Sequence, residues 1–208
     1  MVSEYFDLSR KNWKLWNERS FRVRLLFWFF IAILTLTSLT VFFQYIEGRT
    51  GIYLNDPLLS ALAPKDVSIP VFMLIWTNAL IILFCFIEDP RVLLSFLAGY
   101  SILTITRMLT ITLLPLEPPH GLIALKDPLS NIFYGARFIT KDLFFSGHTS
   151  TLFLIFYNVK HREIKIFSLA TTCLVGFLLL LQHVHYTIDI IFAFPFAYVS
   201  CLLAKKII

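Results

Sequence analysis

Two short polar stretches of this sequence carry residue types that act as nucleophiles, acids and bases: DLFFSGHTS, residues 142–150, and QHVHYTIDI, residues 182–190. In the second stretch, His185 and Asp189 are four residues apart, a spacing that places two side chains on one face of a helix. A carboxylate beside an imidazole accepts its Nδ1–H, which fixes the tautomer and leaves Nε2 available as a base or nucleophile. The alternative interpretation of this pair is a structural hydrogen bond between helices.

The first stretch has the features of a helix start that binds an anion. Ser146 or Thr149 can cap a helix, and Gly147 lets a ligand approach the backbone closely. The first turn of a helix offers N–H groups and a positive dipole, which suit a phosphate. His148 would then meet the phosphate or its leaving oxygen. The alternative is an ordinary cap followed by an interfacial histidine.

The composition indicates that the solvent of this chain is a membrane. Of the 208 residues, 58% are apolar and 15% are charged, with 22 Phe and a mean hydropathy of +0.77. In a soluble domain, about a quarter of the residues are charged. The three Cys lie within apolar runs and show no zinc-site spacing with His. Much of the net charge of +5 comes from the N-terminus, beside the first apolar run, which indicates membrane orientation rather than nucleic-acid binding.

The apolar runs predict an all-α, polytopic membrane protein with a bundle of six transmembrane helices. Each helix needs about 20 apolar residues, and the candidates are residues 22–44, 69–87, 91–114, 145–159, 164–181 and 186–203. The Asp89-Pro90 pair predicts a capped start for the third helix. We therefore expect an amphipathic interfacial segment over residues 1–21 and one membrane catalytic domain over residues 22–208, with long loops at residues 45–68 and 115–143.

The distribution of Lys and Arg predicts the orientation of this bundle. Most of them fall at the N-terminus, in the loops after the second and fourth helices, and near the C-terminus. By the positive-inside rule, both termini are then cytoplasmic and both long loops are non-cytoplasmic. His148 and His185 would open the fourth and sixth helices at the same, non-cytoplasmic face. The compact chain, without evident glycosylation or retention signals, favours a bacterial inner membrane.

Taken together, these motifs resemble a known family. SGHT followed by H-x-x-x-D on the next-but-one helix resembles the phosphatidic-acid phosphatase type 2 (PAP2) superfamily. More closely, DLFFSGHTSTL and HYTIDIIFAF resemble the two catalytic motifs of sphingomyelin synthases and their relatives. RMLTITLLPLEPP, residues 107–119, is similar to the segment of those enzymes that runs from an arginine to LP-x-P. The resemblance extends over roughly residues 91–208.

The resemblance implies a mechanism that uses two histidines. His185 would attack the phosphorus of a lipid phosphodiester and form a phosphohistidine, and Asp189 would orient it. His148 would protonate the departing lipid alkoxide and then take the proton of the incoming hydroxyl. The family needs no metal or other cofactor, and the sequence offers no evident carboxylate cage for one.

Two departures from the phosphatase branch favour head-group transfer. Its K-x6-R-P motif and the S-R pair before its last histidine, which supply cations for a phosphate dianion, are both absent. A diester has one negative charge fewer. We therefore expect a transferase that moves a phospho-head group from a glycerophospholipid to a ceramide-like lipid alcohol and releases diacylglycerol. A lipid phosphate phosphatase and a non-catalytic lipid-binding protein are the alternatives, and no nucleic-acid partner is expected.

Further residues are predicted to bind substrate, namely Arg107, Glu117, Asp142, Ser146, Gly147 and Tyr186. Arg107 lies within a predicted helix, where a charge is costly, and is a candidate counter-ion for phosphate. The resemblance places an acidic residue at Asp142, which would contact a head-group amine or tune His148. The alternatives are solvated loop carboxylates for Asp142 and Glu117, a snorkelling or paired Arg107, and an aromatic-belt role for Tyr186.

Overall fold

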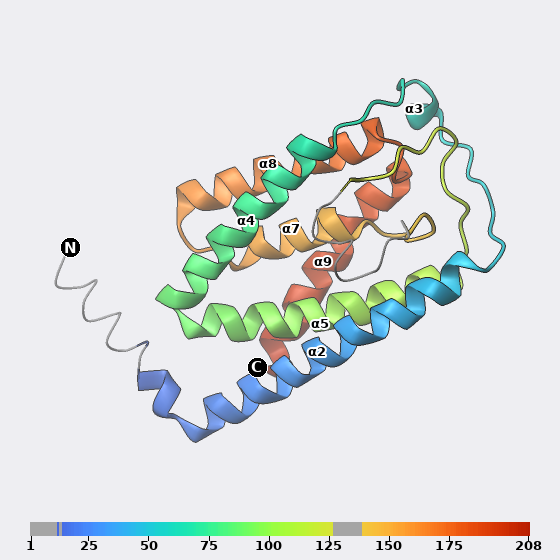
Figure 1. The fold of residues 1–208 in the computed structure, drawn as a ribbon. Coiled ribbons are helices and arrows are strands. Elements are labelled where there is room, and N and C mark those ends of the chain that lie inside the picture. Colours follow the sequence, from blue (N-terminus) through green and yellow to red (C-terminus); the bar gives the residue numbers. More distant parts are fainter. Residues whose placement is uncertain (1–11, 13, 127–138) are drawn as a thin grey trace.

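The computed structural model describes residue 12, residues 14–126 and residues 139–208. These residues are mainly helical and contain no β-strand, in line with the all-α prediction; an isolated parallel bridge joins Ile52 and Leu116. The helical elements, shown in Figure 1, are η1 (Leu15–Asn17), α2 (Arg19–Glu47), α3 (Pro57–Ser60), α4 (Ser68–Glu88), α5 (Pro90–Leu113), α7 (Gly147–Asn158), α8 (Arg162–Leu181) and α9 (Thr187–Ile207).

In the part of the chain that the structure describes, five helices are long and apolar enough to cross a membrane, namely α2, α4, α5, α8 and α9. Their outer surfaces carry large exposed apolar side chains such as Leu26, Phe30, Ile69 and Ile87, which suit contact with lipid. The start of α5 is as predicted: Pro90 is its first residue, and the Asp89 side chain accepts a hydrogen bond from Arg91 N at 3.0 Å. The prediction of spanning helices is therefore supported for five of the six candidates.

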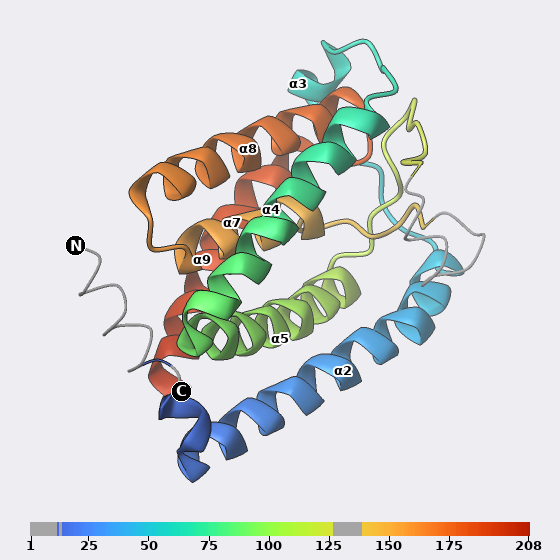
Figure 2. The same cartoon turned by 60° about the vertical axis from the view of Figure 1, so that its left-hand side comes forward.

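The remaining candidate, residues 145–159, is the fourth along the chain and corresponds to the shorter helix α7 inside the bundle. Its 12 residues extend about 18 Å, less than the roughly 30 Å of a hydrocarbon core. It packs against α4, α5, α8 and α9, and Figures 1 and 2 show it among these helices. Phe145 precedes the helix and is buried with its ring stacked on Phe196. Phe145 is apolar because it packs in the core, although it lies outside the helix. The apolar run therefore begins before α7 does, and the predicted helix begins too early.

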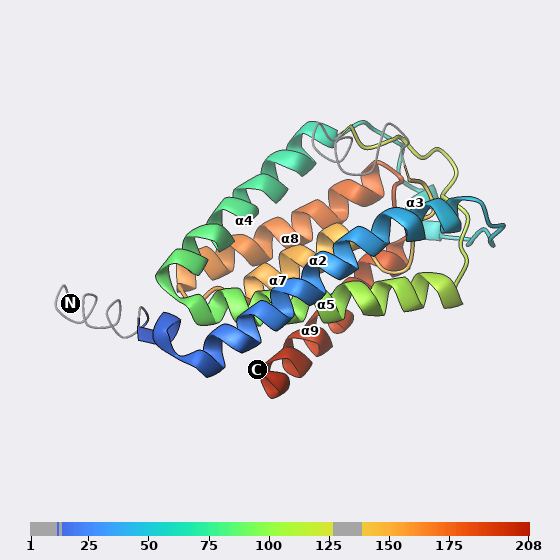
Figure 3. The same cartoon turned by 60° about the horizontal axis from the view of Figure 1, so that its bottom comes forward.

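The helices alternate in direction, so the bundle has two chemically different ends (Figures 1 and 3). At one end, here called the loop end, α4, α7 and α9 begin and the long connections meet. At the other, the basic end, α2, α5 and α8 begin and α9 finishes. The basic end holds most of the Lys and Arg in the described residues, namely Lys14, Arg19, Arg22, Arg24, Arg91, Lys160, Arg162, Lys165, Lys205 and Lys206. The predicted segregation of charge is present, and the membrane side of each end stays a prediction.

Candidate active site

The first turn of α7 presents His148 at the loop end. Ser146 is the N-cap residue, and its Oγ accepts a hydrogen bond from Thr149 N at 3.4 Å. Gly147 is the first helical residue and His148 the second. The N–H groups of a first turn have no acceptor within the helix and lie at the positive end of its dipole. The sequence Ser-Gly-His-Thr therefore forms a helix start with the geometry of an anion site.

His185 and Asp189 are in contact, but they do not share a helical face as the spacing predicts. Helix α9 begins at Thr187, so His185 lies in the turn that follows α8. Asp189 is the third residue of α9, and its Oδ2 lies 3.2 Å from His185 Nδ1. Because an ionised carboxylate only accepts, Nδ1 donates this bond, and Nε2 of the neutral imidazole keeps the lone pair. Both side chains are buried, which strengthens the interaction.

Asp189 also connects α9 to the segment that leads into α7. Its Oδ2 accepts from Tyr186 N at 3.0 Å, and its Oδ1 accepts from Phe144 N at 3.2 Å. Its main-chain oxygen accepts from Ser146 N at 3.1 Å. The carboxylate is fully buried and has a donor on each oxygen. One residue therefore orients His185 and fixes the start of α7.

His148 and His185 both line a cavity of about 540 Å³. Arg107, Asp142 and Gly147 line the same cavity, so five of the nine predicted site residues meet there. Apolar side chains of α2, α4 and α5 form much of the remaining wall, among them Leu39, Phe43, Phe72, Ile82, Phe86 and Phe96. The cavity therefore joins a polar region at the loop end to apolar walls that extend toward the end of α4. The other four predicted residues, which do not line it, are Ser146, Asp189, Glu117 and Tyr186.

Arg107 brings a buried positive charge to this cavity. Its Nη2 lies 2.6 Å from Asp142 Oδ1, and its Nε donates to Phe145 O at 3.1 Å. The side chain is 11% exposed, so the charge within α5 is paired and does not snorkel to solvent. A Cβ atom at Gly147 would lie 2.5–2.7 Å from the guanidinium. The lack of a side chain at Gly147 thus lets Arg107 reach the N-terminus of α7.

We expect Gly147→Ala to destabilise the protein. The added methyl group would overlap the Arg107 guanidinium, and relief of this overlap displaces the ion pair with Asp142. Overpacking of this kind typically costs about 1–3 kcal/mol, which exceeds the helix propensity that Ala adds. Thermal unfolding in detergent measures the effect, with Gly48→Ala as the control because a Cβ there has no neighbour closer than 3.7 Å. Equal melting temperatures for the two variants would contradict the prediction.

The part of the chain that contains both histidines matches a known family. Residues 141–206 match the model described as PAP2 superfamily C-terminal. The match supports the PAP2 superfamily. It includes His148, His185 and Asp189 and excludes Arg107. A comparison with curated proteins gives no match. Together with five apolar helices of spanning length, the PAP2 match supports an integral membrane protein of the phosphatase or phosphotransferase type, and it does not extend to the sphingomyelin synthase branch.

Glu117 and Tyr186 do not line the cavity of this PAP2-like region, and their role in substrate binding stays a prediction. Glu117 Oε1 accepts hydrogen bonds from Gly51 N at 2.7 Å and from Lys141 Nζ at 3.0 Å. Tyr186 Oη donates to the main-chain oxygen of Glu117 at 3.0 Å. A Cβ at Gly51 would lie 2.6 Å from the Leu116 carbonyl carbon, so the two loops touch backbone to backbone. Both predicted residues therefore join the loops around the cavity.

The pairing of Glu117 gives the loop end a defined acid sensitivity. The hydrogen bond from Lys141, and after it the bond from Gly51, lowers the pKa of Glu117 below its ordinary value of 4.5. The resulting stabilisation is complete above that pH and is lost as the pH falls through the lowered folded-state pKa. We expect the melting temperature to fall between about pH 5 and pH 3, and to fall less in Glu117→Gln, which cannot titrate. Identical pH profiles for the two proteins would overturn this expectation.

Sequence reasoning misses two residues that attach the loops to the PAP2-like region. Asp56 accepts from Leu59 N in α3 and from Thr187 N, at 2.7 Å, in α9; Figure 2 shows α3 at the loop end. Burial alone would raise the pKa of Asp56, but hydrogen bonds from Thr187 and Leu59 hold it below its ordinary value. Gln182 is fully buried and donates to Ser68 Oγ at 2.9 Å. The Asp56-Pro57 pair is a sequence signal for a helix cap and could have identified Asp56. Gln182, which lies beside a histidine, has no such signal.

Proposed function

We propose that this protein is an integral membrane phosphotransferase that moves a phospho-head group from a glycerophospholipid to a lipid hydroxyl. The observation that carries the proposal is that His148 and His185 line one cavity whose remaining wall is largely apolar. The histidines suit reaction at phosphorus, and the apolar wall suits the acyl chains of the substrate. The PAP2 match supports chemistry at a lipid phosphate.

In the first half-reaction, His185 Nε2 attacks the phosphorus of the donor lipid. The bond between phosphorus and the glycerol oxygen breaks, and its electron pair leaves with the oxygen. His148, as an imidazolium, gives that oxygen a proton, so diacylglycerol departs neutral. The phospho-head group stays on His185 as a phosphohistidine. Asp189, which accepts from Nδ1 of the same ring, balances the positive charge of the substituted imidazole.

In the second half-reaction, the hydroxyl of a ceramide-like acceptor attacks the same phosphorus. His148, now neutral, takes the hydroxyl proton, and the bond between phosphorus and His185 breaks. Both histidines return to their starting states, so no further reagent is required. The positive end of α7 and the Arg107 guanidinium are placed to stabilise the negative oxygens on phosphorus in both halves.

The charge around the cavity fits a phosphodiester better than a phosphate monoester. Among the Lys and Arg residues that the structure describes, Arg107 alone lines the cavity. Its guanidinium forms an ion pair with Asp142. Lys141 is paired with Glu117 and does not line the cavity. A monoester has close to two negative charges at neutral pH, whereas a diester has one. A single shared guanidinium therefore supports the diester as substrate.

A lipid phosphate phosphatase is the second candidate, because the PAP2 match supports it equally. The first half-reaction would be the same on a phosphate monoester such as phosphatidic acid. Water would then replace the lipid hydroxyl in the second half-reaction, and inorganic phosphate would be the product. The two candidates therefore differ in acceptor and in donor charge, and both use His148 and His185 in the same roles.

Lipid mass spectrometry of the purified protein in detergent separates the candidates. The protein and its His185→Ala variant are incubated with mixed glycerophospholipids, with and without ceramide, and separately with phosphatidic acid. A phospho-ceramide formed with an equal amount of diacylglycerol, and lost in the variant, supports the transferase and names the head group. Inorganic phosphate released from phosphatidic acid without an acceptor supports the phosphatase. If neither product forms, both proposals are contradicted and a non-catalytic lipid-binding protein is favoured.

We further infer that the polar region of the cavity lies near the non-cytoplasmic face, because His148 and His185 are at the loop end and most of the described Lys and Arg are at the basic end. Lys65 and Lys206 are exposed at the loop end and the basic end, respectively. In a cysteine-free background, Lys65→Cys should react with an impermeant maleimide in intact cells, and Lys206→Cys only after permeabilisation. The reverse pattern would overturn this orientation.

A further inference from the structure

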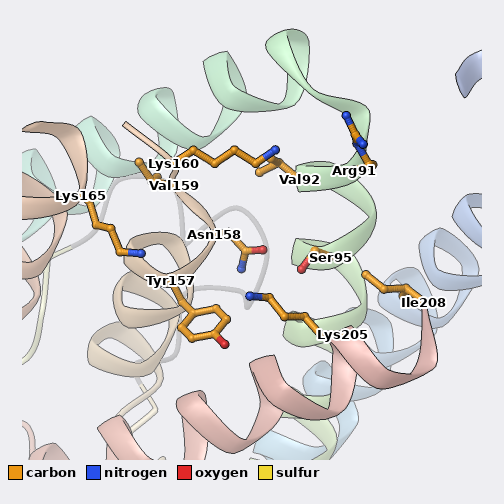
Figure 4. A pocket seen from close by; sticks show the side chains of 10 residues that line it. All are labelled: Arg91, Val92, Ser95, Tyr157, Asn158, Val159, Lys160, Lys165, Lys205 and Ile208. Atoms are coloured by element: carbon orange, nitrogen blue, oxygen red, sulfur yellow. The ribbon is translucent and has the colours of Figure 1, made fainter. Parts of the chain in front are cut away.

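A second cavity lies at the basic end, at the opposite end of the bundle from His148 and His185. Its volume is about 430 Å³, and it is bounded by the start of α5, the ends of α7 and α9, and the turn into α8. Figure 4 shows its lining side chains. Four of them are cationic, namely Arg91, Lys160, Lys165 and Lys205. The proposed reaction uses none of these groups.

Two of the four cations are neutralised in part by the carboxylate of Asp89, which does not itself line the cavity. Asp89 Oδ1 lies 3.1 Å from Arg91 Nε, and Asp89 Oδ2 pairs with Lys160. Asp89 also caps α5, so its position is fixed by the helix start. Asp89 therefore partly neutralises the charges of Arg91 and Lys160, but not those of Lys165 and Lys205.

Lys165 and Lys205 have no carboxylate partner within the part of the chain that the structure describes. The Lys205 ammonium lies 4.3 Å from the centroid of the Tyr157 ring, and the Lys165 ammonium lies 5.1 Å from that of Phe156. In Figure 4 both ammonium groups point toward the space beside the Asn158 amide. Like charges that converge in this way repel one another unless an anion lies between them.

Orientation in the membrane explains some of these charges but not their arrangement. The positive-inside rule requires basic residues at one end, and Lys205 in the last turn of α9 also balances the helix dipole. Neither role requires the lysines to line a cavity between three helices. Neither role places neutral polar groups such as Ser95 and Asn158 in the same wall. The combination of cations and neutral donors around one space is the chemistry of a phosphate site.

We propose that this cavity binds the phosphate group of an anionic phospholipid, at the opposite end of the bundle from the reaction. Lys165 and Lys205 would contact the phosphate oxygens, and Asn158 and Ser95 would complete the site. Leu202 and Leu203, next to Lys205 on α9, are exposed, so the acyl chains of the lipid have an apolar surface to lie against. Basic pockets between transmembrane helices bind anionic head groups in this way. The proposal is independent of the function proposed above.

Native mass spectrometry of the full chain in detergent, titrated with phosphatidylglycerol, tests the proposal. The double variant Lys165→Gln/Lys205→Gln removes the two unpaired charges of the cavity. The control Arg162→Gln/Lys206→Gln removes two charges from the same helices and the same end, but neither residue lines the cavity. We expect the apparent affinity to fall about tenfold or more in the cavity variant and little in the control. Equal loss in both double variants, or loss in neither, would overturn the proposal.

Inorganic phosphate and phosphatidylcholine, tested as further ligands, identify the source of the phosphate group. Two single variants replace the double variant if it misfolds. If inorganic phosphate displaces phosphatidylglycerol from the wild type and from the control alike, the cavity accepts the group from either source. Absence of competition supports the lipid alone. Binding of phosphatidylcholine as tight as that of phosphatidylglycerol would overturn the proposal, because its ammonium group is repelled by the lysines. If the double variant fails to give a cooperative melting transition, Lys165→Gln and Lys205→Gln are measured singly.

Discussion

Replacing His185 with alanine is expected to reduce turnover of a lipid phosphate by on the order of 10⁴-fold or more. The imidazole supplies Nε2, the atom that forms the bond to phosphorus, and without it no phosphohistidine can accumulate. Within the described residues, the His185 side chain makes its hydrogen bond to Asp189, so most of the loop end should keep its structure. Steady-state kinetics and the melting temperature, measured on the same preparation, separate loss of the nucleophile from loss of the fold.

His161→Ala is the matched control for this variant. His161 is exposed at the basic end, where its ring pairs with Glu88, and it should be replaceable without loss of turnover. His148→Ala gives a sharper comparison when the donor has a nitrophenolate leaving group, which needs no proton. That variant should then still form the phosphohistidine in a rapid-quench experiment, whereas His185→Ala should not. Wild-type turnover in His185→Ala would exclude this residue as the nucleophile.

Asp189→Asn is expected to lower turnover by about 10²–10⁴-fold and also to destabilise the protein. The asparagine keeps the shape of the side chain but has a donor where one oxygen now accepts. If the amide nitrogen faces His185 and Tyr186, donor meets donor at both; if it faces Phe144, that N–H loses its acceptor. Each buried donor left without a partner costs about 1–3 kcal/mol. In the first orientation the imidazole also loses the acceptor that fixes its tautomer, and in either orientation it loses the negative charge beside Nδ1.

The rate of phosphohistidine formation distinguishes positioning by Asp189 from a purely structural role. A positioning residue should lower this rate while the KM for the donor lipid changes little. Asp66→Asn is the control, because Asp66 is a loop carboxylate that pairs with the exposed Lys126 and does not line the cavity. If Asp189→Asn melts earlier but forms phosphohistidine at the wild-type rate, Asp189 does not orient His185 for reaction.

Much of the fold follows from sequence patterns that reflect local physics. Apolar runs predict the five long helices, because a chain in lipid must satisfy its backbone within helices. The Asp89-Pro90 pair marks the start of α5 correctly, since both residues act on the backbone next to them. The Ser-Gly-His-Thr sequence marks the start of α7 for the same reason, although the predicted range begins too early at Phe145.

The errors arise where contacts between distant segments override the local pattern. The spacing of His185 and Asp189 predicts a helical face, but the chain places them across a helix cap, where Asp189 also bonds Tyr186 N. The sequence likewise gives no sign that the Glu117 carboxylate accepts hydrogen bonds from Gly51 and Lys141, 66 and 24 residues away. No local feature encodes such pairings, so the cavity wall could be predicted only in part.

The shortness of α7 bears on how the chain enters the membrane during synthesis. Twelve residues offer too little apolar length to partition into lipid alone, and all its neighbours except α4 and α5 are made after it. The three-residue turn between α7 and α8 is short enough for the two helices to enter together as a hairpin. Until α9 follows, Phe144 N and Ser146 N lack the acceptors that Asp189 provides, although Arg107 of α5 already donates to Phe145 O. We therefore expect the site to assemble only after α9 is in place, because α9 supplies the Asp189 carboxylate that contacts His185.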